Sequence, residues 1–415
     1  MIAVRSEKLK FIFVLNEPYP PFRVDTTVLF GEEMVRRGHR IKLVMQSKDN
    51  KLTTSVETWN GCDVLVISNR DSNSIFSKIV KNIEGLSRGF HLFKLLKEKD
   101  WQFVQVRDLF VVGAIALLAA KIRRKQFFFW LSFPVPEMHI YRAKNKYAKY
   151  PSLEMLKGRI FKFILYKIIA KYSDHIFVQS DKMKQDMQIN GVKDDKMTPI
   201  YMGISKKHLD YYKTFQRVKK SDGIKRIVYL GTLDKARRLD FLIRVHAMVV
   251  SKCNNVELYF VGGGIDTSDE ELLRKEARRL GVENSIVFTG YVNIDTALQY
   301  VKESDVGLSP YYPTFIYNST SPTKLIEYMA LRCPVVANTH PEQTLIINES
   351  GAGLCVPWEE KEFADAILHI LNNPDVAEEM GRRGYEYVSK HRSYSILADK
   401  LEAKYFELQK IDAPT

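Results

Sequence analysis

The strongest constraint on the fold is an alternation of short apolar runs with longer amphipathic segments along nearly the whole chain. Runs of this length are typical of buried strands, and the segments between them are long enough for helices. Strands that alternate with helices form parallel sheets, because each helix returns the chain to the edge where the next strand begins. The sequence therefore predicts an α/β fold.

The same pattern gives the positions of the expected elements. Strands in the first half are expected at Phe11–Leu15, Ile41–Met45, Val64–Ile67, Phe103–Val106, Phe127–Leu131 and Ile176–Val178. Strands in the second half are expected at Ile227–Leu230, Glu257–Val261, Ile286–Thr289, Val306–Ser309, Pro334–Ala337 and Gly353–Val356. Helices are expected at Thr26–Arg37, Leu109–Arg123, Leu239–Val250, Asp269–Leu280, Asp295–Lys302, Thr323–Leu331 and Glu360–Leu371.

With 415 residues, the chain is too long for one hydrophobic core. The polar stretch 205–225 separates two halves of similar rhythm. We therefore expect a Rossmann-like N-terminal domain over 1–204, a linker over 205–225 and a Rossmann-like C-terminal domain over 226–394. Ligands of such sheets bind at the carboxyl ends of the strands, here in a central cleft that both sheets face.

Composition excludes several classes of protein. The chain is 45% hydrophobic and 27% charged, as soluble globular proteins are. The longest apolar run is too short to cross a bilayer and no signal peptide is apparent, so we expect a cytoplasmic protein. The 4 cysteines lie far apart in the sequence. Their spacing does not match a metal site, and the sequence contains no D-x-D motif, so no bound metal is predicted. The sequence also has no zinc-finger, RNP-like or helix-turn-helix pattern, so nucleic-acid binding is not predicted.

The segment 321–330 predicts a helix whose start faces an anion. Ser321 is a favourable N-cap, and Pro322 suits the first helical position. The free N–H groups of Thr323, Lys324 and Leu325 would then point out of the helix start, where the helix dipole is positive. Glu327 lies one turn further on and suits ribose hydroxyls. The alternative is a capped surface helix whose Lys and Glu are merely solvated.

The formal charge of +14 is concentrated in one region. Residues 142–171 hold nine Lys and Arg residues and one acidic residue, Glu154. From Leu153 to Tyr172 the basic residues alternate with apolar ones, as in a basic amphipathic helix. We expect residues 142–171 to contact an anionic membrane surface at its inner, cytoplasmic face. The alternative is a core-packing helix with a solvated basic edge.

Seven segments in a characteristic order resemble one family of enzymes. They are 173–180 (SDHIFVQS), 201–204 (YMGI), 228–233 (VYLGTL), 260–264 (FVGGG), 286–292 (IVFTGYV), 304–310 (SDVGLSP) and 321–337. Together they resemble the retaining glycosyltransferases of family four (glycosyl transferases group one), which have the GT-B fold. The resemblance covers nearly the whole chain. It implies that residues 395–415, at the end of the chain, form a helix that crosses back onto the N-terminal domain.

The resemblance also assigns roles to residues of the donor site. The family motif E-x7-E places its second acid, which holds the donor ribose, on Glu327. Its first acid falls on Ser319, so the usual contact to the sugar is in doubt. An Arg expected after Gly231 is replaced by Thr232. Arg237 and its neighbour Arg238 stand where the family has a phosphate-binding Lys, and the alternative for both is an exposed loop pair.

Loops supply further candidates. Arg23, in a Pro-rich loop where relatives have paired glycines, is a candidate phosphate ligand, and the alternative is a structural turn with an exposed Arg. His139 and Glu137 follow the strand after which many relatives carry an active-site His, although a lone His is more often structural. The remaining candidates form the nucleobase wall that the resemblance implies: Gly263, Gly290, Tyr291 and Val292.

The predicted function is metal-independent transfer of a hexose-type sugar, with retention of configuration. The donor would be a nucleoside diphosphate sugar, a UDP- or GDP-sugar, and the acceptor a glycan or a lipid-linked glycan of the cell surface. Because Ser319 and Thr232 replace charged residues, a non-catalytic sugar-nucleotide-binding subunit is the alternative. An epimerase or a phosphorylase on the same fold is a third possibility, which fold alone does not exclude.

Overall fold

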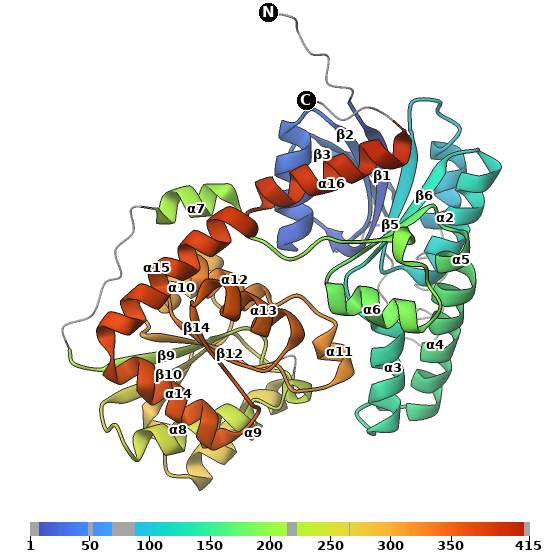
Figure 1. Ribbon diagram of the computed structural model, residues 1–415. Coiled ribbons are helices and arrows are strands. Elements are labelled where there is room, and N and C mark those ends of the chain that lie inside the picture. The colour runs from blue at the N-terminus through green and yellow to red at the C-terminus, as the bar shows by residue number, and fades with distance from the viewer. Residues whose placement is uncertain (1–7, 49–52, 69–87, 214–221, 265, 411–415) are drawn as a thin grey trace, which may run out of the picture. The chain divides into compact units, whose positions relative to one another are not determined.

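The computed structural model describes residues 8–48, 53–68, 88–213, 222–264 and 266–410. The chain divides into two compact units (Figure 1). The first contains residues 1–201 and 394–415, and the second contains residues 202–393. In the described part of the chain, no helix combines the length and the apolarity needed to cross a bilayer.

The first unit contains one sheet and the helices that cover it. Its strands are β1 (Lys10–Tyr19), β2 (Arg40–Ser47), β3 (Ser55–Trp59), β4 (Cys62–Ile67), β5 (Phe103–Arg107), β6 (Gln126–Leu131), β7 (His175–Val178) and β8 (Met197–Pro199). Its helices are η1 (Asp25–Met34), α2 (Phe110–Ile122), α3 (Val135–Lys144), α4 (Pro151–Phe163), η2 (Ile164–Ile169), α5 (Ala170–Tyr172), α6 (Asp181–Ile189), η3 (Asp194–Lys196) and α16 (Tyr394–Gln409).

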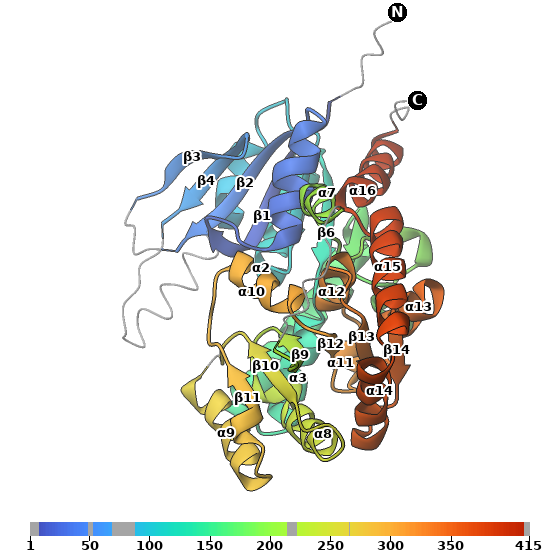
Figure 2. The ribbon, with the colours of Figure 1, turned by 90° about the vertical axis from the view of Figure 1, so that its left-hand side faces the viewer.

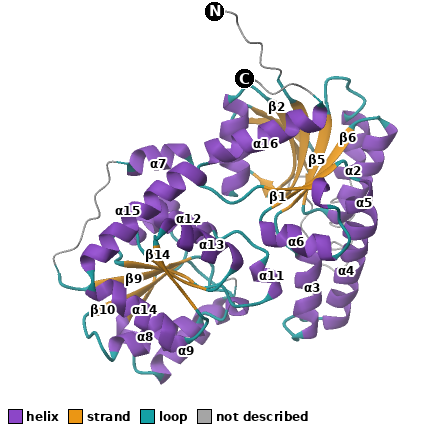
Figure 3. Cartoon of the chain, viewed as in Figure 1, coloured by secondary structure: helices purple, strands orange, loops and turns teal. Residues whose placement is uncertain are grey.

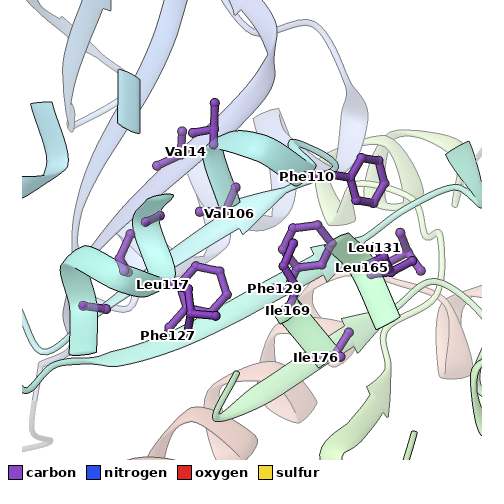
Figure 4. Packing of buried hydrophobic residues seen from close by; sticks show 14 of the residues in the cluster. Val14, Val106, Phe110, Leu117, Phe127, Phe129, Leu131, Leu165, Ile169 and Ile176 are labelled. Carbon is purple, nitrogen blue, oxygen red and sulfur yellow. The ribbon is translucent and has the colours of Figure 1, made fainter. Parts of the chain in front are cut away.

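The first sheet has eight strands in the order β3-β4-β2-β1-β5-β6-β7-β8, and its β3 edge is visible in Figure 2. All its pairs are parallel except the β3–β4 pair. The central strands are buried on both faces, which explains their continuous apolar runs. On one face, Val106 and Phe129 pack with residues of α2 and η2 (Figure 4). On the other, Phe103 packs with Tyr405 of α16, so the end of the chain completes this core.

The second unit repeats the plan. Its strands are β9 (Lys225–Leu230), β10 (Val256–Val261), β11 (Ile286–Phe288), β12 (Val306–Ser309), β13 (Val335–Asn338) and β14 (Gly353–Val356). Its helices are α7 (Lys206–Tyr212), η4 (Lys235–Arg237), α8 (Asp240–Val250), α9 (Thr267–Arg279), η5 (Glu283–Ser285), α10 (Ile294–Lys302), α11 (Phe315–Asn318), α12 (Thr323–Ala330), α13 (Pro341–Ser350), α14 (Glu360–Asn372) and α15 (Pro374–His391).

The second sheet is parallel throughout, in the order β11-β10-β9-β12-β13-β14. Figure 3 shows its strands with helices around them. The order steps outward from β9 in both directions, so β9 and β12 are the neighbours between which the winding reverses. Ligands of such sheets bind at the carboxyl edge beside this point. The predicted α/β class with two largely parallel sheets is confirmed.

The expected strands are all present, and the structure adds two short ones at the edges of the first sheet, β3 and β8. In β3 the sequence SVETW is largely polar, and β8 has only 3 residues, so neither has the apolar run of a central strand. Part of the expected linker 205–225 forms a helix, α7. Helix α7 forms there because Leu209 and Tyr212 lie one turn apart and are both buried in the second unit.

Candidate functional site

The candidate site lies at the carboxyl edge of the second sheet, beside β9 and its neighbours β12 and β13. Loops from these strands lead into η4, α12 and α13. Tyr328 fixes α12 on this edge, because its buried hydroxyl accepts the N–H of Leu230 at 2.8 Å and donates to the carbonyl of Leu308 at 3.2 Å. A Cβ at Gly307 would lie 2.7 Å from the Tyr328 ring, so glycine permits this close packing. Tyr328 therefore packs against β9 and β12.

The start of α12 differs from the prediction. Its N-cap is Pro322, and no side chain caps the helix. Ser321 is not the cap, because its hydroxyl accepts the N–H of Met202 at 3.1 Å and donates to Glu342 at 2.8 Å. The first N–H groups of the helix, including those of Thr323 and Lys324, have no intrahelical acceptor, which leaves them available to an anion.

Lys324 stands in the first turn of α12 and is only 7% exposed. Its ammonium lies 4.5 Å from the centre of the Tyr311 ring and 5.5 Å from that of Tyr229. In the described part of the chain, no carboxylate forms an ion pair with it. Burial, reinforced by the charge of Arg237, lowers the pKa of Lys324 to about 7, although Glu327 opposes the shift. A buried cation without a counter-ion is a site for a bound anion.

Glu327 lies one helical turn beyond Lys324 and is half-buried. Burial raises the pKa of its carboxyl to about 7, and the charge of Lys324 opposes that shift. The ammonium of Lys324 and the carboxyl of Glu327, one helical turn apart, thus both have a pKa of about 7. Leu325, between them in sequence, is fully buried and packs in the core of the second unit.

Arg237 brings a second cation to Lys324 from η4. Its guanidinium lies near the hydroxyls of Tyr229 and Tyr311, and its charge opposes the rise that burial causes in the pKa of both tyrosines. Arg238 points elsewhere: it is exposed, pairs with Asp240 at 3.3 Å and lies over the ring of Tyr312. The structure therefore brings Arg237, but not Arg238, together with Lys324.

The glycines after β9 and β10 let these turns approach each other. A Cβ at Gly262 would lie 2.2 Å from the carbonyl oxygen of Gly231, so a side chain there is excluded. Thr232 follows Gly231, and its carbonyl accepts the Tyr229 hydroxyl at 3.3 Å. The loop that lacks the expected Arg is thereby tied to the tyrosine that lies beside Lys324.

The residues expected to form a nucleobase wall are adjacent in space. Gly262 and Gly290 form an isolated β-bridge, which joins the loops after β10 and β11. The ring of Tyr291 covers Gly263, where a Cβ would lie 2.6 Å from it, and the Tyr291 hydroxyl donates to the carbonyl of Gly264 at 3.1 Å. Val292 continues this loop and packs against the core.

Ser319, at the first acidic position of the family motif, has a local partner. Ser319 directly follows α11, and its buried hydroxyl donates to the carbonyl of Phe315, the first residue of that helix, at 3.0 Å. The neighbouring Thr320 hydroxyl donates to the carbonyl of Tyr317 at 2.7 Å. Both side chains thus stabilise the turn that leads into α12.

Two residues that the sequence reasoning missed hold the loop around Lys324. Asn338, at the end of β13, accepts the N–H of Tyr311 at 2.6 Å and donates to its carbonyl at 2.8 Å. His340 donates from Nε2 to the carbonyl of Tyr317 at 2.9 Å, while its Nδ1 accepts the N–H of Glu342 at 3.2 Å. Burial lowers the pKa of His340 to about 4, so it is neutral at physiological pH.

Glu342 is a third missed residue, and it connects the site to both ends of the second unit. Its carboxylate accepts from Ser321 and from Arg392, the latter at 2.9 Å with both side chains buried. Ser321 in turn holds the backbone of Met202, the first residue of the unit. No local pattern reveals this network, since its members are far apart in the sequence.

The candidates in the first unit have partners close by. Glu17 accepts the N–H groups of Phe22 and Arg23, each at 3.0 Å, which shapes the Pro-rich loop. His139 bonds to Glu154 of α4 at 2.8 Å. Glu137 lies 3.7 Å from Lys162 and 3.3 Å from the Tyr166 hydroxyl, and burial raises its pKa. His139 and Glu137 thus join α3 to the α4–η2 segment.

A buried polar cluster at the carboxyl edge of the first sheet was also missed. Arg107 pairs with Asp25 at 2.8 Å, and Asp108 accepts the N–H of Ser132 at 2.8 Å. Burial raises the pKa of Asp108, while Arg107 and Ser132 lower it. Asp108 has φ +51°, a left-handed backbone conformation that Asp adopts more readily than most residues. Among the described residues of the whole chain, no group of three or more His, Cys, Asp or Glu could hold a metal ion.

Comparison with known proteins gives two family matches. Residues 26–208 match the model of Glycosyltransferase Family 4, and residues 224–373 match that of Glycosyl transferases group 1. Alpha-monoglucosyldiacylglycerol synthase of Streptococcus pneumoniae is 26% identical over 40% of this chain and 39% of its own. The capsular polysaccharide biosynthesis glycosyltransferase CapH of Staphylococcus aureus is 25% identical over 55% of this chain and 58% of its own. The chain thus spans only part of the length of these relatives.

The fold likeness extends over nearly the whole chain. The structure of Anabaena Alr3699/HepE in complex with UDP is similar with a TM-score of 0.68, over 96% of this chain and 100% of that one, at 14% identity. With the two family matches, this shows that the protein belongs to the GT-B glycosyltransferases of group 1 and family 4.

Proposed function

We propose that the protein transfers a sugar from a nucleoside diphosphate sugar to a glycan or a lipid-linked acceptor, with retention of configuration. The second unit binds the donor in this proposal, and the first unit binds the acceptor. The observation that carries the proposal is the buried, unpaired ammonium of Lys324 at the start of α12, beside Arg237 and one turn from Glu327.

The diphosphate would occupy the start of α12, where Lys324 and the free N–H groups meet. Arg237 would take the outer phosphate oxygens. Glu327 would accept hydrogen bonds from the ribose hydroxyls, and the Gly263–Tyr291 wall would contact the base. The HepE structure was determined with UDP, which supports a nucleotide donor here, with UDP and GDP sugars both open.

These groups would act on the leaving group. As the bond from the anomeric carbon to the diphosphate oxygen breaks, negative charge grows on that oxygen, and fixed cations stabilise it without a metal ion. The acceptor oxygen then forms its bond on the same face of the sugar, and the departing phosphate takes the acceptor proton. No protein base is needed in this route, which agrees with the structural partners of His139 and Glu137.

The first experiment is a thermal-shift screen with nucleoside diphosphates and their sugars, because a ligand that binds the native state raises the unfolding temperature. Glu327→Ala should then abolish transfer and leave the circular dichroism spectrum unchanged. Full turnover by that variant would refute the site. The relatives in glycolipid and capsule synthesis direct the choice of acceptors to lipid-linked glycans.

A non-catalytic subunit that binds sugar nucleotides is the second candidate. It is favoured by the absence of charge at two positions of the family motifs. The Ser319 hydroxyl bonds to the carbonyl of Phe315, and Thr232 stands where an Arg is expected. Tight nucleotide binding with no consumption of donor, across a range of acceptors, would support it.

A further inference from the structure

Helix α4 presents an exposed apolar stripe to solvent. The stripe consists of Leu153, Leu156, Ile160 and Phe163, which are 65%, 55%, 46% and 60% exposed. At about 100° per residue, these four side chains fall within an arc of roughly 80° on one side of the helix. Four large apolar side chains on one helix face are unusual on a soluble surface unless something covers them.

The core does not use this face, because the inner side of the same helix already packs against the protein. A Cβ at Gly158 would lie 2.9 Å from the carbonyl oxygen of Pro136, so α4 and α3 are in close contact. Further along, Leu165 and Ile169 of η2 point into the core of the first unit (Figure 4). On α4, Gly158 lies about 180° from the middle of the stripe. The apolar residues of 153–172 therefore form two sets, one packed in the core of the first unit and one exposed to solvent.

Basic residues border the stripe. Lys157 and Arg159 are exposed, and the helical angle places them on its two flanks. Lys167 and Lys171 are exposed further along the same segment. The one acidic residue of this region, Glu154, is bonded to His139 on the inner side.

Aromatic residues mark the two ends of this segment. Tyr150, before α4, is 62% exposed, and Tyr172, at the end of α5, is 52% exposed. The ammonium groups of Lys149 and Lys171 lie 5.6 Å and 5.1 Å from the centres of these rings. Tyrosine with a neighbouring lysine is typical of segments that lie at a membrane interface.

We infer that α4 docks on an anionic lipid surface, with the stripe inserted among the acyl chains and the flanking cations at the head groups. Charge complementarity selects this occupant. A second copy would bring an equally basic surface to the same face, and the two would repel. A lipid surface provides both parts of the match, since its acyl chains bury the stripe while anionic head groups neutralise Lys157 and Arg159.

This inference goes beyond the proposed function and does not depend on it, because its residues lie in the first unit and the nucleotide site lies in the second. If both hold, docking would keep the enzyme at the surface where lipid-linked acceptors reside. Failure of one leaves the other testable, because nucleotide binding is measured without lipid.

The experiment is flotation of the full chain with vesicles of phosphatidylcholine, with and without phosphatidylglycerol. We expect binding only to the anionic vesicles, and weaker binding at high salt. Leu156→Ser with Ile160→Ser should lower the partition coefficient by at least about tenfold, since each inserted side chain removes a large apolar area from water. Lys157→Gln with Arg159→Gln should lower it by about fivefold per charge.

Matched controls lie in the second unit. Leu272 and Leu345 are 54% and 46% exposed, and replacing both by Ser should leave binding unchanged. Lys206→Gln with Lys207→Gln, both exposed, is the charge control. Circular dichroism of each variant establishes that it is folded, and Leu153→Ser provides a second, milder change in the stripe.

Three outcomes would overturn the inference. Equal binding to neutral and anionic vesicles would remove the role of charge. Undiminished binding by the folded stripe variants would place the contact elsewhere. A dimer in light scattering that the stripe variants dissociate would identify a second copy as the occupant.

Discussion

The buried ammonium of Lys324 makes a quantitative prediction about the pH dependence of nucleotide affinity. Its pKa of about 7 lies well below the usual value of about 10.4 for lysine. At roughly 1.4 kcal/mol per unit, keeping this group charged in the empty site costs about 5 kcal/mol. A bound diphosphate would supply the missing negative charge and raise the pKa again, so binding should take up a proton.

The sign follows directly. Below about pH 7 Lys324 is already protonated, and nucleoside diphosphate affinity is at its highest. Above it, each pH unit should weaken binding by about tenfold, so the affinity for UDP or GDP should fall about a hundredfold between pH 7 and pH 9. The terminal phosphate adds little to this slope, because it ionises near pH 6. Glu327, with its pKa raised to about 7, ionises over the same range, so its titration must be removed to isolate the contribution of Lys324.

The assay is isothermal titration calorimetry in buffers of different ionisation enthalpy, which counts the protons taken up. Glu327→Gln removes one titrating group and should leave the tenfold slope of Lys324. Lys324→Met in that background should weaken binding at pH 6 and make it independent of pH. Lys252→Met, a change in an exposed ion pair with Asp365, is the control and should keep the wild-type slope. A flat profile in the wild type, or an unchanged slope in the Lys324 variant, would refute the reasoning.

Three further predictions concern Glu342, Tyr328 and His139. Glu342→Ala should lower the free energy of unfolding by about 3–5 kcal/mol in denaturant titrations, because it leaves Arg392 charged and buried. Glu342→Gln should lower it by less. A loss below about 1 kcal/mol for the Ala variant would show that the ion pair is not needed for stability. Tyr328→Phe should cost about 1–3 kcal/mol in the same titrations, since it leaves the N–H of Leu230 without an acceptor, and an unchanged midpoint would contradict that bond. His139→Gln should retain transfer activity with only a reduced melting temperature, whereas loss of transfer in a folded protein would restore His139 as a catalytic candidate.

Local pattern was sufficient for the central strands of both sheets and for the spacing of residues along α12. The central strands were predictable because burial on both faces requires an unbroken apolar run, as in β5 and β6. The spacing of Lys324 and Glu327 on α12 was predictable for a similar reason. Residues three apart on a helix lie on neighbouring positions of its surface whatever the surroundings.

The tertiary structure decided which partners each side chain contacts and whether it is buried. Ser321 had the type of an N-cap, yet its hydroxyl bonds to Met202 and Glu342, which are distant in sequence. Likewise, the sequence of the α4–η2 segment has apolar residues on both sides, and only packing shows that Ile169 of η2 is buried while Ile160 of α4 is exposed. Helical period is a local property of the backbone, whereas the choice of a partner depends on which distant segments the fold brings within reach.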